Sequence, residues 1–274
     1  MALALSADGA RIASYSRDRT IKLWDVTSRQ ELYTFDNQLL DLNSIAFSPD
    51  GRLLATGGTI WDVKSKTVLH LLDRGEARKP AFSPDGTLLA VGAVGGASVK
   101  LWDVTSGQAV RTFDSLANND TFTTVFSPDG ALVATSGYDG VIELWDVRSG
   151  QVARTFAYGY DFGIHSIAFS PDGSLLASGG TGETVRLWDV ATGQVVRALA
   201  QSGGLYGLAF SPDGALLATV GEAHVAWLWD VASGRLLRTL PQADETMAVA
   251  FSADGTLLAI GGYDSHVYLW AVPR

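Results

Sequence analysis

Apolar and polar positions alternate along this chain in short runs, and the same arrangement returns about every 40 residues. Its clearest copy contains the turn tetrapeptide Ser170-Pro171-Asp172-Gly173, in which proline pre-sets φ, aspartate can bond backbone N–H groups and glycine takes the left-handed conformation. Four short runs surround this turn and two later ones, over residues 165–169, 174–178, 185–188 and 194–199. Such runs, separated by glycine turns and without helical periodicity, predict four antiparallel strands.

The unit occurs seven times, and each copy carries a tryptophan at the end of its third run. These tryptophans are Trp24, Trp61, Trp102, Trp145, Trp188, Trp229 and Trp270. A period of about 40 to 45 residues with four strands is the repeat length of a propeller blade. Because the first two strands are apolar on both faces, each unit needs a neighbour on each side. The prediction is an all-β, seven-bladed β-propeller of four-stranded antiparallel blades, over residues 1–36, 43–72, 78–114, 121–156, 163–199, 205–240 and 246–274.

The residue pair Trp-Asp closes six of the seven units, and only Trp270-Ala271 departs from it. On this pair and the glycine turns, the chain is similar to WD-repeat (WD40) β-propellers of prokaryotic type, as one domain over residues 1–274. The resemblance implies a buried network in each blade, built from a histidine, a Ser or Thr, an Asp and the tryptophan. The hydroxyl positions, ten residues before the tryptophan, are Ser14, Thr135, Ser178 and Thr219; the aspartate positions are Asp18, Asp139 and Asp264. The network histidine is missing, and Tyr160 stands at its place in blade five.

Blades two and seven depart from the pattern. In blade two only five steps separate Thr56 from Trp61, which predicts shortened strands and a two-residue Gly57-Gly58 turn with positive φ at both glycines. In blade seven only four residues follow Trp270, too few for a fourth strand. The family usually closes its ring with an N-terminal outer strand, but Leu3 already lies in the first strand of blade one. We therefore expect a three-stranded blade seven with an edge open to another strand, closure by face packing alone, and a natural polypeptide that continues upstream.

Charge and composition exclude several kinds of partner and site. The formal net charge of −9 argues against nucleic acid or an anionic membrane as the partner. The chain has no cysteine, which excludes disulfides and thiolate metal sites and fits a cytoplasmic location. No apolar run approaches the roughly 20 residues of a membrane span.

A search for chemistry gives little support to catalysis. His224 and His266 stand near Glu222 and Asp264, and two histidines with two carboxylates could bind zinc if they converged. The alternative interpretation of these residues, which we favour, is solvated loops. The SPDG aspartates are interpreted as turn residues, and no histidine stands beside Ser170 or its equivalents to activate a nucleophile. We predict no enzyme activity and no cofactor. A propeller hydrolase or metal-dependent enzyme, and a designed or recombined propeller, remain the alternatives.

The resemblance implies recognition of a protein or peptide at the top face, where the turns between second and third strands meet the channel mouth. The positions at this face are Arg17, Asn43, Arg78, Phe122, Tyr138, His165, Tyr206, Met247 and Tyr263. Aromatic residues, Arg and Met are the types enriched at interface hot spots. The sequence thus predicts a non-catalytic interaction scaffold, with a larger bacterial signalling protein as an expected setting.

Overall fold

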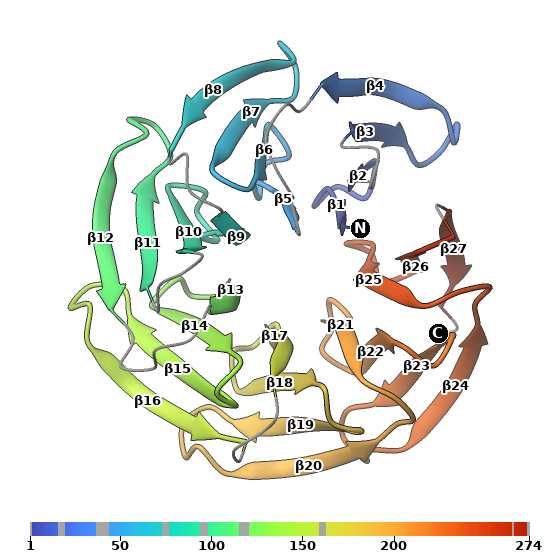
Figure 1. Ribbon diagram of the computed structural model, residues 1–274. Coiled ribbons are helices and arrows are strands. Elements are labelled where there is room, and N and C mark those ends of the chain that lie inside the picture. The colour runs from blue at the N-terminus through green and yellow to red at the C-terminus, as the bar shows by residue number, and fades with distance from the viewer. Residues whose placement is uncertain are drawn as a thin grey trace.

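A computed structural model describes residues 2–15, 20–36, 44–72, 77–93, 98–114, 121–158, 163–264 and 266–272. All regular structure in these residues is strand, arranged in seven antiparallel sheets. The sheets follow one another around a central channel, with the first strand of each sheet innermost (Figure 1). The predicted seven-bladed β-propeller is confirmed.

The strands run outward in chain order within each blade. Blade one contains β1 (Ala2–Leu5), β2 (Arg11–Tyr15), β3 (Thr20–Asp25) and β4 (Glu31–Asp36). Blade two contains β5 (Ile45–Phe47), β6 (Leu53–Thr56), β7 (Thr59–Asp62) and β8 (Thr67–Leu71). Blade three contains β9 (Ala77–Phe82), β10 (Leu88–Ala93), β11 (Ser98–Asp103) and β12 (Ala109–Asp114). Blades four and five contain β13 (Thr121–Phe126), β14 (Leu132–Gly137), β15 (Val141–Asp146), β16 (Val152–Ala157); and β17 (Ile164–Phe169), β18 (Leu175–Gly180), β19 (Thr184–Asp189), β20 (Val195–Ala200). Blades six and seven contain β21 (Leu205–Phe210), β22 (Leu216–Gly221), β23 (Val225–Asp230), β24 (Leu236–Pro241); and β25 (Thr246–Phe251), β26 (Leu257–Gly262), β27 (Val267–Ala271).

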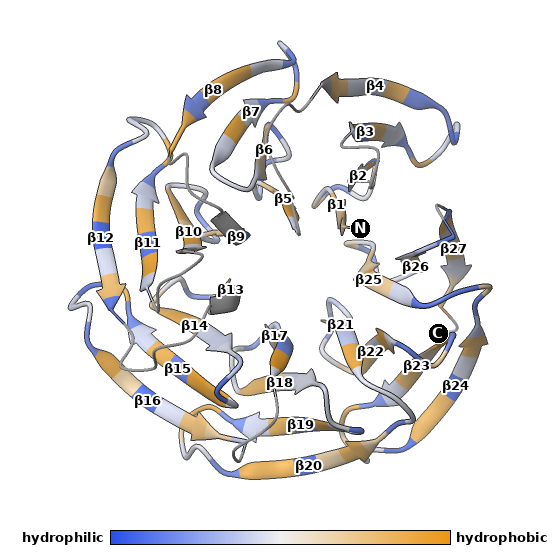
Figure 2. Ribbon diagram, viewed as in Figure 1, coloured by the Kyte–Doolittle hydropathy of each residue, from blue (hydrophilic) through white to orange (hydrophobic). Residues whose placement is uncertain are grey.

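The hydrophobic core lies between neighbouring blades. One buried cluster joins Leu101 and Phe113 of blade three to Val133 and Trp145 of blade four, and the other clusters also join consecutive blades. Phe113 stacks on Trp145 with ring centroids 5.3 Å apart. Apolar residues also occur on the outermost strands (Figure 2), where Leu237 is 54% exposed. The described part of the chain has no helix long and apolar enough to cross a bilayer.

The hydroxyl positions matched from the sequence accept hydrogen bonds from their tryptophans. The Nε1–H groups of Trp24, Trp145, Trp188 and Trp229 donate to Ser14, Thr135, Ser178 and Thr219 at 2.8, 3.0, 2.7 and 3.0 Å. This bond fixes the third strand to the second within each blade. It satisfies an indole donor that would otherwise be buried without a partner.

Blade two keeps four strands and the same bond despite its short turn. Trp61 Nε1 donates to Thr56 Oγ1 at 3.0 Å, and Thr56 pairs directly with Thr59. The strands β6 and β7 have 4 residues each, as the sequence predicts. The turn differs in one respect from the prediction: Gly57 has a φ of 45°, whereas Gly58 lies outside the left-handed region. A single positive φ at the first turn position also suits the twist of a tight hairpin.

This pairing leads to a testable expectation for blade two. Inserting a copy of residues 180–184 between Gly57 and Gly58 should change the melting temperature by only a few degrees, because lengthening a surface loop costs little chain entropy. The insertion leaves the register of Leu54 with Trp61 and the Thr56 hydrogen bond unchanged. Thermal unfolding followed by circular dichroism measures the effect. A drop of tens of degrees would mean that blade two depends on packing specific to the short turn.

Blade seven has three strands in the order β25-β26-β27, which confirms the prediction from its sequence. The ring closes where β1 lies against β25 and β26 (Figure 1). No described strand pairs with the outer edge of β27. The seam between blades one and seven therefore relies on contact between sheet faces.

Candidate partner-binding face

A β-bulge brings the predicted mouth residues to the channel. In β13, β17, β21 and β25 the pairing with the second strand skips one residue of the first strand. The skipped residues are Phe122, His165, Tyr206 and Met247. A bulge leaves its extra residue out of the ladder and can re-aim the side chain. The repeated bulge therefore gives the mouth one such residue from each of blades four to seven.

Four aromatic side chains of the predicted set come from the consecutive blades four to seven, and Tyr263 lies near enough to Tyr206 to contribute to the raised pKa of that hydroxyl. The rings of His165 and Tyr206 stack with centroids 6.0 Å apart and planes 15° apart. A Cβ built on Gly163 would lie 3.4 Å from Tyr138 Cδ1 and 3.5 Å from His165 Nε2, so both rings approach the same glycine. Tyr138 is 54% exposed and Tyr263 is 36% exposed. We call Tyr138, His165, Tyr206 and Tyr263 the aromatic arc.

The electrostatics of the arc centre on Tyr206. Its hydroxyl donates to Glu222 Oε1 at 3.1 Å, and Glu222 Oε2 accepts from the Gly204 N–H at 3.0 Å. Burial raises the pKa of Tyr206 to about 12, and the charges of Glu222 and Glu245 contribute in the same direction. Burial also lowers the pKa of His165, with the charge of Lys79 adding to the effect, so this imidazole is neutral at pH 7. At neutral pH the stacked rings of His165 and Tyr206 are thus uncharged and lie beside the Glu222 carboxylate.

Blade three departs from the repeated bulge, and its sequence did not lead us to the residue that results. Gly92 pairs with Arg78 and Ala90 with Ala81, so Lys79 and Pro80 together face one residue of the second strand. Lys79 has a φ of 37° and lines the channel. Its Nζ donates across the channel to the carbonyl oxygen of His165 in blade five. The signal available in the sequence was Pro80, which lacks the N–H that a regular ladder needs.

The other predicted residues of this face are only partly accounted for. Arg17 and Asn43 lie outside the described residues. Arg78 and Phe122 have a described backbone in β9 and β13, but their side chains lie outside the description. The predicted set as a whole stays a prediction, with five of its side chains placed.

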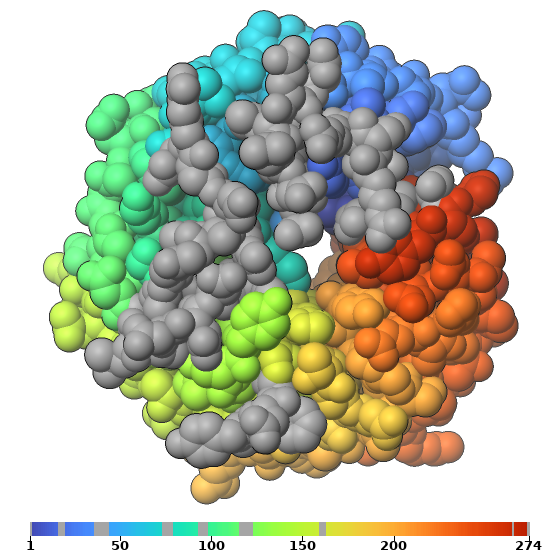
Figure 3. Space-filling model, in the orientation of Figure 1, coloured from blue at the N-terminus to red at the C-terminus, as the bar shows by residue number. Residues whose placement is uncertain are grey.

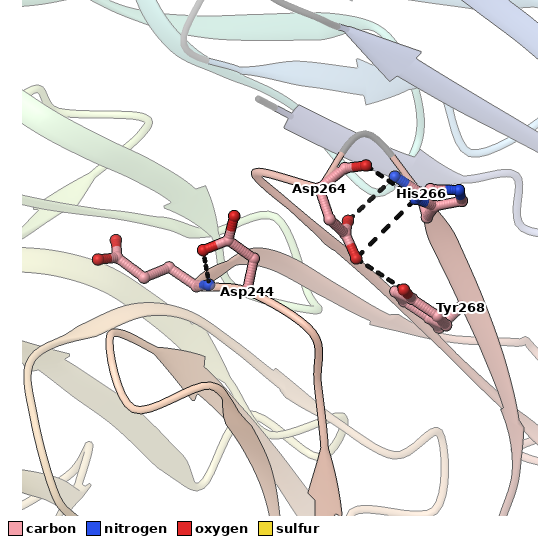
Figure 4. A network of polar contacts seen from close by, with 5 residues as sticks. Asp244, Asp264, His266 and Tyr268 are labelled. Atoms are coloured by element: carbon pink, nitrogen blue, oxygen red, sulfur yellow. Dashed lines mark hydrogen bonds and ion pairs between the residues drawn. The ribbon is translucent and has the colours of Figure 1, made fainter.

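Three of the four loop residues weighed as zinc ligands, Glu222, Asp264 and His266, form other hydrogen bonds. Asp264 Oδ2 accepts from the Tyr268 hydroxyl at 2.7 Å, and its Oδ1 accepts from the His266 N–H at 3.0 Å (Figure 4). His266 Nδ1 lies 2.7 Å from the carbonyl oxygen of Asp264. Among the described residues, no three His, Asp or Glu side chains gather closely enough to hold a metal ion. In this region the carboxylate orders its own turn.

The SPDG aspartates accept the hydrogen bonds that hold their turns together. Asp172 Oδ1 accepts from Ser170 Oγ at 2.5 Å and from the Ser174 N–H at 3.0 Å. The same pair of bonds recurs in the other blades and lowers the pKa of each aspartate, to about 2 for Asp254. The Ser170 hydroxyl is therefore bonded to a carboxylate that accepts, and the pair has no imidazole base.

Comparison with known proteins places the chain among WD-repeat propellers. Residues 41–229 match the family described as nucleolar protein 10-like, N-terminal domain, and residues 1–25 and 234–271 match the WD domain, G-beta repeat. The chain is 30% identical over 146 residues to WD repeat-containing protein SL1-17 of Schistosoma mansoni, covering 51% of this chain and 48% of that protein. It is 27% identical to apoptotic protease-activating factor 1 of Rattus norvegicus (43% of this chain, 11% of the relative) and 31% identical to small ribosomal subunit protein RACK1y of Oryza sativa subsp. japonica (35% and 30%). The chain thus spans less than half the length of these relatives.

Proposed function

Because this chain belongs to the WD-repeat family of β-propellers, we propose that it is a non-catalytic scaffold that binds a protein or peptide partner at its top face. The observation that supports the proposal is the aromatic arc, a set of four rings from consecutive blades in which His165 and Tyr206 stack and Tyr206 lines the channel cavity. Exposed aromatic rings that converge in this way are the usual anchors of protein interfaces. Two relatives are named as components of assemblies, the small ribosomal subunit and the U5 small nuclear ribonucleoprotein.

Two finer parts of the proposal concern setting and partner. A cytoplasmic location fits the lack of cysteine. A role within a larger bacterial signalling protein belongs to the proposal as well, although the relatives named above are eukaryotic. The open edge of β27 offers a second means of binding, since an exposed edge can pair with an added strand.

The arc yields a prediction for binding. Peptides selected from a displayed random library on the wild-type protein should lose about 1–3 kcal/mol of affinity when Tyr206→Ala or Tyr263→Ala is introduced, because each change removes a hot-spot ring. Isothermal titration calorimetry on purified variants gives the affinities. Leu237→Ala, an exposed apolar residue on the outer strand β24, serves as the matched control and should leave affinity unchanged. Peptides that bind both tyrosine variants at full strength but lose affinity for Leu237→Ala would place the interface elsewhere.

A further inference from the structure

One level of the channel is formed by seven equivalent residues, one from each blade. Each stands three residues before the Phe or Leu that ends its first strand, and all seven line the same cavity of about 180 Å³. They are Ala2, Ser44, Lys79, Thr123, Ser166, Gly207 and Ala248. Figure 3 shows the molecule hollowed at the centre of the ring. A cavity of this size has room for a few water molecules or one small polyatomic ion.

The residues of this level carry positive charge and hydroxyl groups but no negative charge. It contains one ammonium group, three hydroxyls and three small residues, and it contains no carboxylate. The Lys79 ammonium has three N–H groups, and the carbonyl oxygen of His165 is its one acceptor among the described residues. The hydroxyls of Thr123 and Ser166 have no hydrogen-bond partner among those residues, and neither oxygen belongs to the fully buried unpaired atoms, so both are open to the cavity. The described residues that line the cavity therefore offer several groups that can donate to an anion, and no carboxylate that would repel one.

The titratable groups around Lys79 do not neutralise it. His165 is neutral at pH 7 and so supplies no charge. Tyr206 donates its hydroxyl to Glu222, and the Glu222 carboxylate is held at the mouth by that bond and by the Gly204 N–H. Loss of hydration is the cause that lowers the pKa of Lys79 to about 8. Lys79 is half-buried on the wall of the cavity. A partly dehydrated cation without a counter-charge is unfavourable, and a bound anion would relieve that cost.

We propose that this cavity binds a small oxyanion, a carboxylate or phosphate group, through Lys79 Nζ and the hydroxyls of Thr123 and Ser166. The small residues Ala2, Gly207 and Ala248 leave the opposite wall free for the ion. The group can come from a free ion or from the end of a peptide chain that enters the channel. Tyr206 of the aromatic arc also lines this cavity, but the ligating groups of the proposed site belong to Lys79, Thr123 and Ser166 and not to the arc, so the site stands whether or not the arc binds a partner.

The charge on Lys79 makes the binding depend on pH in a defined direction. An anion binds the protonated amine, so the affinity for a carboxylate should be nearly constant from about pH 6 to pH 7, where the ligand is ionised, and fall as the pH rises through the pKa of about 8. For the empty protein the sign is different. Because the pKa of Lys79 is lower in the folded than in the unfolded chain, the free energy of unfolding should rise between about pH 8 and pH 10.

Isothermal titration calorimetry at constant ionic strength tests the proposal. The free ions titrated into the protein are acetate and inorganic phosphate, and the chain-end ligands are N-acetyl-tetraglycine as the free acid and as the amide. The wild-type protein should bind at least one carboxylate or phosphate ligand saturably, with a dissociation constant in the roughly millimolar range. Binding of the acid but not the amide identifies a chain end as a possible source of the group. Lys79→Met should weaken binding at least about tenfold, because it removes the charge-assisted bond. The matched control Lys64→Met, which removes an exposed lysine in the turn after β7, should bind like the wild type.

A second variant tests the proposal independently if Lys79→Met disturbs the backbone of the bulge. Thr123→Ala with Ser166→Ala retains the ammonium and should weaken binding about threefold or more through the lost hydroxyls. The proposal is overturned if Lys79→Met and Lys64→Met bind equally well. It is also overturned if wild-type binding is not saturable, or if affinity stays unchanged from pH 7 to pH 10.

Discussion

Replacing Thr219 by valine should lower the free energy of unfolding by about 2–4 kcal/mol, although the side chain keeps its shape. The Thr219 hydroxyl accepts from Trp229 Nε1 at 3.0 Å and donates to Gln201 Oε1 at 2.9 Å. Trp229 and Gln201 are 4% and 6% exposed, so neither freed atom can turn to bulk water. Leaving a buried polar atom without its partner costs about 1–3 kcal/mol. Urea denaturation of the purified variant measures the loss.

Blade seven contains the same arrangement with its central hydroxyl missing, and the opposite change should stabilise it. Ile260 stands ten residues before Trp270, and Gln242 stands where blade six has Gln201. Trp270 Nε1 and Gln242 Oε1 are both buried without a hydrogen-bond partner in the described structure. Ile260→Thr supplies an acceptor for the first and a donor for the second. The gain should exceed the lost apolar burial and raise the free energy of unfolding by about 1 kcal/mol.

The two changes form one test because they move stability in opposite directions. Thr239→Val on the outer strand β24 is the matched control: its side chain is exposed, so the same substitution should change stability by less than about 0.5 kcal/mol. If Ile260→Thr destabilises like an ordinary core truncation, the indole of Trp270 already has a partner in solution. If Thr219→Val behaves like Thr239→Val, the hydroxyl bridge contributes nothing to the fold.

This bridge also shows how far sequence reasoning reaches. The hydroxyl and the tryptophan recur at a fixed spacing, so their bond could be predicted for Ser14, Thr135, Ser178 and Thr219. The third member of the network differs between blades five and six, so no fixed spacing could predict it. Gln201 takes the place in blade six. In blade five Tyr158 donates its hydroxyl to the carbonyl oxygens of Ser178 and Thr184 at 3.1 and 2.6 Å, whereas Tyr160, the residue matched by position, lies outside the described residues.

The candidate site was predictable to the same degree. Its positions follow from the repeat, so the sequence alone identifies His165 and Tyr206, whose rings stack in the structure. Contacts across the channel join residues far apart in the chain, such as Lys79 and His165, and no local pattern encodes them. Lys79 lines the channel at the position that Thr123 and Ser166 hold in blades four and five, one residue after the position from which the mouth residues were chosen. Matching the repeats by position therefore selects Arg78 and not the adjacent Lys79.

The lack of a fourth strand in blade seven should make the seam between blades seven and one the weakest part of the ring. In every complete blade, one inward residue of or just after the fourth strand is buried: Phe35, Leu72, Phe113, Phe156, Leu199 and Leu240. Three of them pack on the tryptophan of the next blade, with ring centroids 5.3 to 5.5 Å apart, as Phe156 does on Trp188. No described residue of blade seven occupies this place over Trp24, which is correspondingly only partly buried.

Amide hydrogen exchange should therefore show protection in β26, β27 and β1 at least about a hundredfold lower than in β14 to β19, because the seam can open without unfolding the other blades.

A peptide with the sequence of residues 151–158, which includes β16, should bind antiparallel to β27 and raise protection across the seam. Pairing in blade four sets Ile142 opposite Phe156, so the peptide phenylalanine should lie opposite Val267, the equivalent residue, and cover Trp24. The same peptide with serine in place of that phenylalanine is the control and should bind at least about tenfold more weakly, because it keeps the backbone bonds but loses the buried ring. Equal protection around the whole ring would contradict the weak seam, and equal binding of the two peptides would show that the place over Trp24 is not open to a side chain.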